Sequence, residues 1–311
     1  MILVGGENLV DFLQEAGGEG HPVYRANPGG SPFNTAMAIG RQDAPVGYLT
    51  PISSDSLGQL LRMTLVASGV DCLAPPSDKP TSLAVVSLVD GQPSYQFYRE
   101  NTAEREVTTA SLRACLPDPV TCLQIGSLCL ANGRDADDWA VLATHLSASQ
   151  VPVTFDPNIR PAFIHDRGDY FRRFRQVMAA ADLVKLSDED INWLYPDEDM
   201  QVAAKRLFDE NDLAMLVLTK GGDGAVAFTA SGRIDMDAAP VPDLVDTVGA
   251  GDTFMATLIA QLYTRELLDK SAMRGASRDD LAAILGLAAR AAAINCGRKG
   301  CNPPTRAELG G

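Results

Sequence analysis

Short apolar runs alternate along the chain with segments whose apolar positions recur at helical spacing. Continuous apolar runs are typical of strands that are covered on both faces of a sheet. They predict strands over Ile2–Val4, Val46–Ile52, Cys122–Ile125, Val151–Phe155, Leu183–Leu186 and Met215–Leu218. Helices are expected between them, as from the cap-and-proline pair Ser31-Pro32 and over Ser56–Ser68. The alternation predicts an α/β fold with three layers around a mostly parallel sheet, in one domain over residues 1–311.

Two stretches depart from this pattern. Residues 83–98 read as a hairpin, with strands over Leu83–Val89 and Ser94–Tyr98 joined by an Asp90-Gly91 turn. Residues 9–25 read as a second extended excursion. We expect a small β-sheet, from about 9–25 and 83–99, that acts as a lid on the main domain. Tyr95, Phe97 and Arg99 alternate onto one face, which is either an ordinary half-buried face or one that meets a ligand.

The most informative segment runs from Asp246 to Phe254 and contains Gly-Ala-Gly-Asp at 249–252. It predicts a glycine-rich turn that opens onto a helix. A helix N-terminus has unpaired N–H groups and partial positive charge, and glycines let an anion come close to it. Asp252 in the first turn suits the role of a base that takes a proton from a hydroxyl attacking phosphorus. The alternative is that Asp252 only caps the helix.

Composition narrows the function classes. The net charge of −14 argues against nucleic acids and anionic membrane surfaces as partners. No apolar run reaches the length of a membrane span, and the N-terminus has no basic stretch of a signal peptide. The six cysteines form no Cys-x-x-Cys pair and read as small buried apolar residues. A reduced, cytoplasmic enzyme is expected.

Other nucleotide-binding schemes do not fit. The chain has no Gly-x-x-x-x-Gly-Lys-Ser/Thr string, which argues against a P-loop enzyme. Gly5-Gly6 after the first strand continues with Glu7-Asn8, so the fingerprint of a dinucleotide-binding dehydrogenase is also missing.

The Gly-Ala-Gly-Asp string with Asp-Thr just ahead of it resembles the hallmark of the ribokinase-like (PfkB) sugar kinases. The resemblance implies catalysis by Asp252, with an anion hole at Gly249, Ala250 and Gly251. The stretch from Pro28 to Ala36 resembles the first family signature. The resemblance then implies a sugar site made by Asp11, Gly29, Gly30 and Asn34, closed from the lid by Phe97 and Arg99.

Further strings along the chain extend the resemblance. Residues 155–161 resemble a string of bacterial fructokinases and 2-keto-3-deoxygluconate kinases, in which Arg160 reaches the sugar or the phosphate. Residues 185–190 align with the family's Asn-x-x-Glu motif but read Ser187-x-x-Asp190, so Asp190 either binds magnesium through water or caps a helix. The residues expected to contact ATP are Lys185, Ser187, Thr219, Gly221, Gly222, Gly224 and Asn295. Backbone carbonyls near Asp246 and Val248 are where relatives hold a monovalent cation such as K⁺.

These strings together look most like bacterial fructokinases. The resemblance implies ATP-dependent phosphorylation of fructose at its 6-hydroxyl, with Mg²⁺. The alternatives are 2-keto-3-deoxygluconate kinase, which would need a cation such as Arg99 or Arg160 for the acid, another sugar kinase of the family, or a sugar-binding regulator without catalysis. The small-molecule partners are then a sugar and ATP. The oligomeric state stays open, with a homodimer paired through lid strands as one alternative.

Overall fold

The computed structural model describes residues 1–15, 21–89 and 92–310. Its main sheet has nine strands within these residues, in the order β13-β12-β11-β10-β9-β8-β1-β4-β5. The strands are β1 Ile2–Gly5, β4 Val46–Tyr48, β5 Val70–Cys72, β8 Cys122–Gly126, β9 Val153–Asp156, β10 Leu183–Ser187, β11 Met215–Thr219, β12 Ala225–Thr229 and β13 Gly232–Met236. All neighbours pair in parallel except β12, which is antiparallel to both β11 and β13. The predicted mostly parallel sheet is confirmed.

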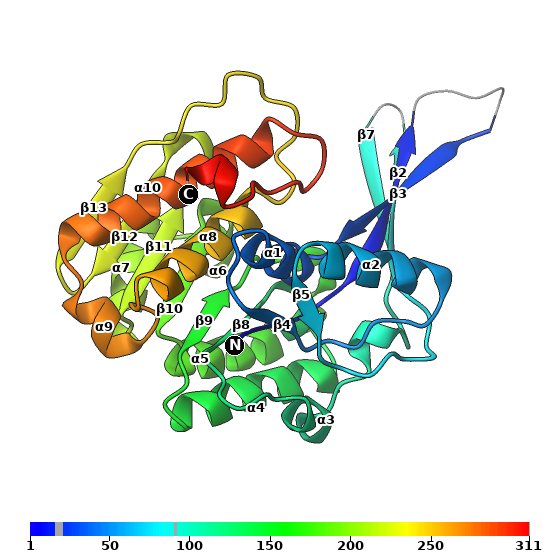
Figure 1. The fold of residues 1–311 in the computed structure, drawn as a ribbon, viewed down its shortest axis with the longest axis horizontal. Coiled ribbons are helices and arrows are strands. Elements are labelled where there is room, and N and C mark those ends of the chain that lie inside the picture. The colour runs from blue at the N-terminus through cyan, green and yellow to red at the C-terminus, as the bar shows by residue number, and fades with distance from the viewer. Residues whose placement is uncertain (16–20, 90–91, 311) are drawn as a thin grey trace.

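Helices cover both faces of this sheet (Figure 1). One core contains side chains of α1 Ser31–Gly40, α2 Ser56–Ala67, α8 Ala250–Thr264, α9 Lys270–Gly275 and α10 Arg278–Cys296. The other contains side chains of α3 Thr109–Ala114, α4 Arg134–Ala148, α5 Arg167–Ala180, α6 Asp188–Leu194 and α7 Met200–Glu210. Strand residues alternate between the two cores: Ile2 and Val4 belong to the first, and Leu3 belongs to the second. The three predicted layers are therefore present.

The order of strands reverses direction beside β1. From β1 the chain continues to β4 and β5 on one side, and from β8 it continues to β9, β10 and β11 on the other. The loops that leave β1 and β8 therefore diverge at their carboxyl ends. In open α/β sheets this switch point is where ligands bind.

A second sheet of four strands projects from this edge (Figure 1). Its order is β3-β2-β6-β7, from β2 Leu9–Glu15, β3 Val23–Gly29, β6 Ser82–Val89 and β7 Gln92–Tyr98. The small sheet predicted from the two extended excursions is confirmed. The predicted Asp90-Gly91 turn, residues 16–20 of the first excursion and the side chain of Tyr95 lie outside what the structure describes.

Some boundaries differ from the prediction. The strand expected to reach Ile52 ends at Tyr48, and the strand expected from Val151 begins at Val153. Beyond Tyr48 the chain leaves the ladder, and Ile52 accepts a backbone hydrogen bond from Ser77 instead. The sequence analysis missed β5, β12 and β13. No helix among the described residues is both long and apolar enough to cross a bilayer.

Candidate active site

A cleft of about 570 Å³ opens at the switch point, between the main sheet and the small sheet. It is lined by residues that follow β1 and β8, by the small sheet, by the turn after β9 and by the start of α8. Of the predicted site residues it contains Asp11, Gly30, Asn34, Phe97, Arg160, Lys185, Val248, Gly249, Ala250, Gly251 and Asp252. A second cavity, of about 480 Å³, lies where β9 and β10 begin, and its Lys270 and Arg274 are already paired with aspartates.

Asp252 lies in this cleft, in the first turn of α8, with 6% of its surface exposed. Both carboxylate oxygens are held by α1: the Ser31 Oγ donates to Oδ1 at 2.6 Å and the Asn34 Nδ2 donates to Oδ2 at 2.8 Å. Burial raises the pKa of Asp252, while these two donors and the charges of Lys185 and Arg160 oppose the rise. The carboxylate is therefore buried and oriented, and two cations act on its charge.

The start of α8 lacks a side-chain cap. Gly249 precedes the helix with φ of 75°, and a Cβ there would lie 2.3 Å from the Cys301 Sγ. The left-handed backbone and this close approach both require glycine. Ala250 donates its N–H to the Thr247 carbonyl at 3.2 Å, so the predicted anion hole rests on its neighbours rather than on Ala250. A first helical turn leaves such N–H groups without intrahelical acceptors, so the N–H of Gly251 can meet an anion.

A buried ion pair lies under this turn. The Lys185 Nζ is 3.0 Å from Oδ2 of Asp156, and a Cβ on Gly251 would lie 3.3 Å from the same Nζ. Burial raises the pKa of Asp156 to about 7; Lys185 lowers it, and the charges of Asp190 and Asp252 raise it further. Burial alone would lower the pKa of Lys185, but these carboxylates outweigh that and the pKa is raised. Lys185 therefore brings a lasting positive charge to the cleft.

Three of the predicted sugar-site residues, Asp11, Gly30 and Asn34, line the same cleft. Asp11 on β2 has its pKa raised to about 6 by burial. A Cβ on Gly29 would lie 2.2 Å from the Asp11 Oδ2, so a bare glycine is needed for that carboxylate to lie where it does. Gly30, with φ of 106°, comes similarly close to the carbonyl of Glu7. Phe97 packs edge-on against Phe163, with ring centroids 4.4 Å apart.

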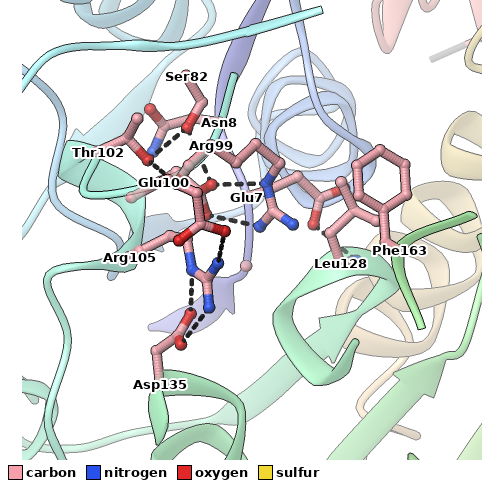
Figure 2. A network of polar contacts seen from close by, with 12 residues as sticks. Glu7, Asn8, Ser82, Arg99, Glu100, Thr102, Arg105, Leu128, Asp135 and Phe163 are labelled. Carbon is pink, nitrogen blue, oxygen red and sulfur yellow. Dashed lines mark hydrogen bonds and ion pairs between the residues drawn. The ribbon is translucent and has the colours of Figure 1, made fainter. Parts of the chain in front are cut away.

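Arg99 requires a correction. It was expected to close over the sugar, but it is buried behind the cleft and does not line it. Its guanidinium donates to both oxygens of Glu104, at 2.8 and 3.1 Å (Figure 2). β7 ends at Tyr98, so Arg99 lies just beyond the strand, where a buried carboxylate binds it. Of these two residues, only Phe97 lines the cleft.

The predicted nucleotide residues divide into two groups. Gly221 and Gly222 form an open turn after β11, and Thr219 at the strand end donates to the Leu186 carbonyl at 3.3 Å. Gly224 packs against the Met236 carbonyl, where a Cβ would be only 2.1 Å away. Contacts of this turn with ATP stay a prediction.

Asn295 and Ser187 are occupied within the protein. Asn295 is fully buried, donates to the Val248 carbonyl at 2.8 Å and accepts from the N–H of Asn302 at 2.8 Å. Its side chain therefore shapes the loop before α8 instead of facing the cleft. Ser187 caps α6 in a reciprocal capping box with Asp190.

The predicted metal residues are likewise engaged. Asp190 accepts from Ile159 N–H at 2.6 Å through one oxygen and from Ser187 through the other. The side chain of Asp246 accepts from the N–H groups of Val248 and Gly300 at 3.0 and 2.9 Å. The predicted monovalent cation would instead be held by backbone carbonyls, of which that of Val248 accepts from the Asn295 Nδ2 at 2.8 Å, and cation binding there stays a prediction. In the part of the chain that the structure describes, no three acidic, histidine or cysteine side chains converge as metal ligands.

The sequence analysis missed Glu7 and Asp156. Glu7 lines the cleft directly after β1, and Asp156 is the last residue of β9. A polar residue that immediately follows a buried parallel strand was the available signal, because the carboxyl ends of such strands meet at the ligand edge. In the sequence, Glu7 served only as evidence against the glycine-rich fingerprint of a dinucleotide-binding dehydrogenase.

An uncapped helix start, a buried carboxylate and a lysine that share one cleft at a switch point define a kinase of small molecules. The sequence profile described as "pfkB family carbohydrate kinase" matches residues 14–308. The chain belongs to the pfkB family of carbohydrate kinases.

Named relatives agree with this assignment. A fructokinase of Rhizobium leguminosarum bv. trifolii is 38% identical over 273 residues, which cover 87% of this chain and 82% of the relative. A fructokinase of Escherichia coli is 31% identical over 99% of this chain and 97% of the relative. The solved fructokinase of Xylella fastidiosa with bound ATP has the same fold, with a TM-score of 0.88, 23% identity, and coverage of 99% of this chain and 96% of that one.

Proposed function

We propose that this sugar kinase transfers the terminal phosphoryl group of ATP to the 6-hydroxyl of D-fructose. The choice of fructose is supported by the two relatives named fructokinase, at 38% and 31% identity. The observation that carries the reaction is the placement of Asp252: a buried carboxylate in the cleft, oriented by two donors, in the first turn of an uncapped helix.

Asp252 acts as the general base. The sugar hydroxyl binds next to its carboxylate and passes its proton to it as the oxygen attacks the γ-phosphorus of ATP. Ser31 and Asn34 hold the carboxylate plane, which keeps the accepting lone pair directed at that hydroxyl. The Asn34 Oδ1 is buried without a hydrogen-bond donor in the described structure, so it is available to a second sugar hydroxyl.

The second reacting group is the phosphoryl group that is transferred from ATP to the sugar hydroxyl. The N–H groups at the start of α8 stabilise its developing negative charge. Lys185 and Arg160, which line the same cleft, add positive charge. Mg²⁺ neutralises charge on the ATP phosphates when it is bound. Because the oxygens of Asp190 already accept protein donors, the phosphates and water would supply most of its ligands.

The second candidate acceptor is 2-keto-3-deoxygluconate, because the Arg160 side chain lines the cleft and can pair with a carboxylate. A panel of fructose, 2-keto-3-deoxygluconate, ribose and adenosine, each with ATP and Mg²⁺, separates the candidates. We expect the highest kcat/KM for fructose. Preference for the acid would replace fructose, and sugar binding without turnover would favour a regulator.

The Asp252→Asn variant tests the mechanism. Loss of the base should lower kcat by roughly 10²–10⁴-fold with sugar binding retained, since general-base losses fall in that range. Asp280→Asn is the matched control, because Asp280 also lies in the first turn of a helix but is exposed and outside the cleft. Near-normal turnover of Asp252→Asn would remove Asp252 from its role.

A further inference from the structure

Glu7 connects the two chain segments that diverge at the switch point. Its carboxylate is 2% exposed. Oε1 accepts the N–H of Ser31, which begins α1, and Oε2 accepts the N–H of Leu128 in the turn after β8, each at 3.1 Å. The N-cap of α1 is Gly30 and not the predicted Ser31, and the helix has no side-chain cap of its own. Glu7 therefore supplies, from a different segment, the acceptor that α1 lacks.

The same end of α1 orients the catalytic base. Ser31 gives its backbone N–H to Glu7 and its hydroxyl to Asp252. Asn34, one turn later, gives its amide to the other oxygen of Asp252. A displacement of this first turn would move both donors of the base together. Ser31 therefore links the carboxylate of Glu7 directly to the carboxylate of Asp252.

A network of buried charged side chains that includes Arg99 and Glu104 lies next to Glu7 at the base of the small sheet (Figure 2). The Arg99 guanidinium lies beside Glu7 and is paired with Glu104, which also accepts from the Ser82 hydroxyl at 2.9 Å. Ser82 begins β6, and Arg99 directly follows β7, so the network reaches two strands of the small sheet. Arg99 attracts the charge of Glu7, which offsets part of the cost of burying it.

We propose that Glu7 is a positioning residue for phosphoryl transfer: its charged carboxylate holds the first turn of α1, so that Ser31 and Asn34 orient Asp252, and Arg99 connects it to the small sheet. The inference rests on the proposed function, because it takes Asp252 as the base. It adds a residue that lines the cleft, and a reason why Arg99 is buried there.

The charge on Glu7 matters because a carboxylate can accept an N–H at each oxygen, whereas a protonated acid presents an O–H to one of them. Burial raises the pKa of Glu7 to about 7, Arg99 lowers it and Glu104 raises it. The Ser127 side chain also lowers it. The other titratable groups near Glu7 are Tyr48, whose hydroxyl donates to the Glu7 backbone carbonyl at 3.0 Å, and the buried thiol of Cys129. As pH falls through about 7, Glu7 gains a proton and loses one of its two N–H contacts.

The test is Glu7→Gln, assayed with saturating ATP, Mg²⁺ and the best acceptor of the panel. We expect kcat at pH 8 to fall roughly tenfold to a hundredfold, because small misplacements of a reacting group have effects of that size. The KM values for ATP and sugar should change little. Below pH 7, log kcat should fall more steeply with pH in the wild type than in Glu7→Gln. The two slopes should differ by up to one unit of log kcat per pH unit, because one group gains a proton. A raised sugar KM with unchanged kcat would make Glu7 a direct sugar contact and overturn the proposal.

Two further variants test the charge of Glu7 while leaving Glu7 itself in place. Glu104→Gln removes a carboxylate that raises the pKa of Glu7. The fall of kcat at acidic pH, the acid limb of the pH profile, should therefore move to lower pH, while kcat at pH 8 is retained. An unmoved limb would overturn the proposal even if Glu7→Gln does not fold. Asp135→Asn is the control: it breaks the Arg105 pair of the same network without contact to Glu7, and should lower the melting temperature but leave kcat and its pH slope unchanged.

The outcome also separates this inference from the proposed function. A wild type that phosphorylates none of the sugars would overturn both. An active wild type whose Glu7→Gln variant keeps its kcat and its pH slope would overturn the positioning role alone.

Discussion

Two buried ion pairs lie near the cleft, and they differ in how completely they are satisfied. Arg99 and Glu104 meet through two hydrogen bonds, at 2.8 and 3.1 Å, and Glu104 also accepts from Ser82. Lys185 and Asp156 meet at 3.0 Å, but neither oxygen of Asp156 has a hydrogen bond of good geometry in the described structure. Lys185 lines the cleft and Arg99 does not.

The difference shows which charge is available to a ligand. A planar guanidinium that donates to both oxygens of a carboxylate has few N–H groups left to bind a substrate. Such a pair also fixes two segments of the chain relative to each other. A lysine ammonium that is loosely paired under a helix start keeps donors free for an incoming phosphate. We therefore propose that Arg99 stabilises the architecture of the site and that Lys185 binds the phosphoryl group.

The largest expected effect is on stability, at the Arg99 pair. Arg99→Met leaves Glu104 buried without its cation, and breaking such a pair by removing one partner costs about 3–5 kcal/mol of unfolding free energy. Urea denaturation measures this loss. Lys205→Ala, at an exposed pair on α7, is the control and should cost about 0.5 kcal/mol or less. Equal losses in the two variants would show that the Arg99 pair does not support the fold.

The next effect is on catalysis, at the Lys185 pair. Lys185→Met keeps the volume of the side chain but removes the charge under the start of α8. We expect kcat to fall by roughly 10²–10³-fold, as it does when one preorganised electrostatic donor is lost. The loss of kcat per folded molecule should exceed that of Arg99→Met. The reverse order would contradict the assignment of the two cations.

The smallest effect is on the pH dependence of stability. The folded-state pKa of Asp156, about 7, lies above its value in the unfolded chain, so between about pH 4 and 7 the native state binds the extra proton. Stability from this group therefore grows as pH falls below 7. Relative to Asp156→Asn, the wild type should gain up to about 1.4 kcal/mol for each pH unit lowered from 7 towards 5. Lys185 stays charged throughout this window.

Denaturation curves of both proteins between pH 8 and pH 5 measure this gain. A constant difference between wild type and Asp156→Asn would mean that Asp156 stays ionised. In that case the Lys185 pair would be as well satisfied as the Arg99 pair.

The layers of the main domain could be predicted from the sequence because strands buried on both faces leave continuous apolar runs. Strand β13 was missed because it lies at the sheet edge and Gly232–Met236 is mostly exposed, whereas β12 was missed although Ala225–Thr229 is buried. The Gly-Arg-Ile-Asp-Met segment of β13 contains no apolar run that distinguishes it from a loop. The small sheet was predicted as two excursions, but the parallel pairing of β2 with β6 joins segments that the pattern treats as separate.

Local sequence alone determined where a helix begins after a glycine turn and which residue stands in its first turn, because backbone freedom and apolar spacing act over a few neighbouring residues. Only the tertiary structure decided the partners of the charged groups. Asp252 takes its hydrogen bond from Ser31 across 221 positions of the chain, Glu7 accepts from Leu128 across 121, and Arg99 turns to Glu104 rather than to the cleft. Spacing sets the face on which a side chain lies, whereas the packing of distant segments sets which charge it meets and how much water remains between them.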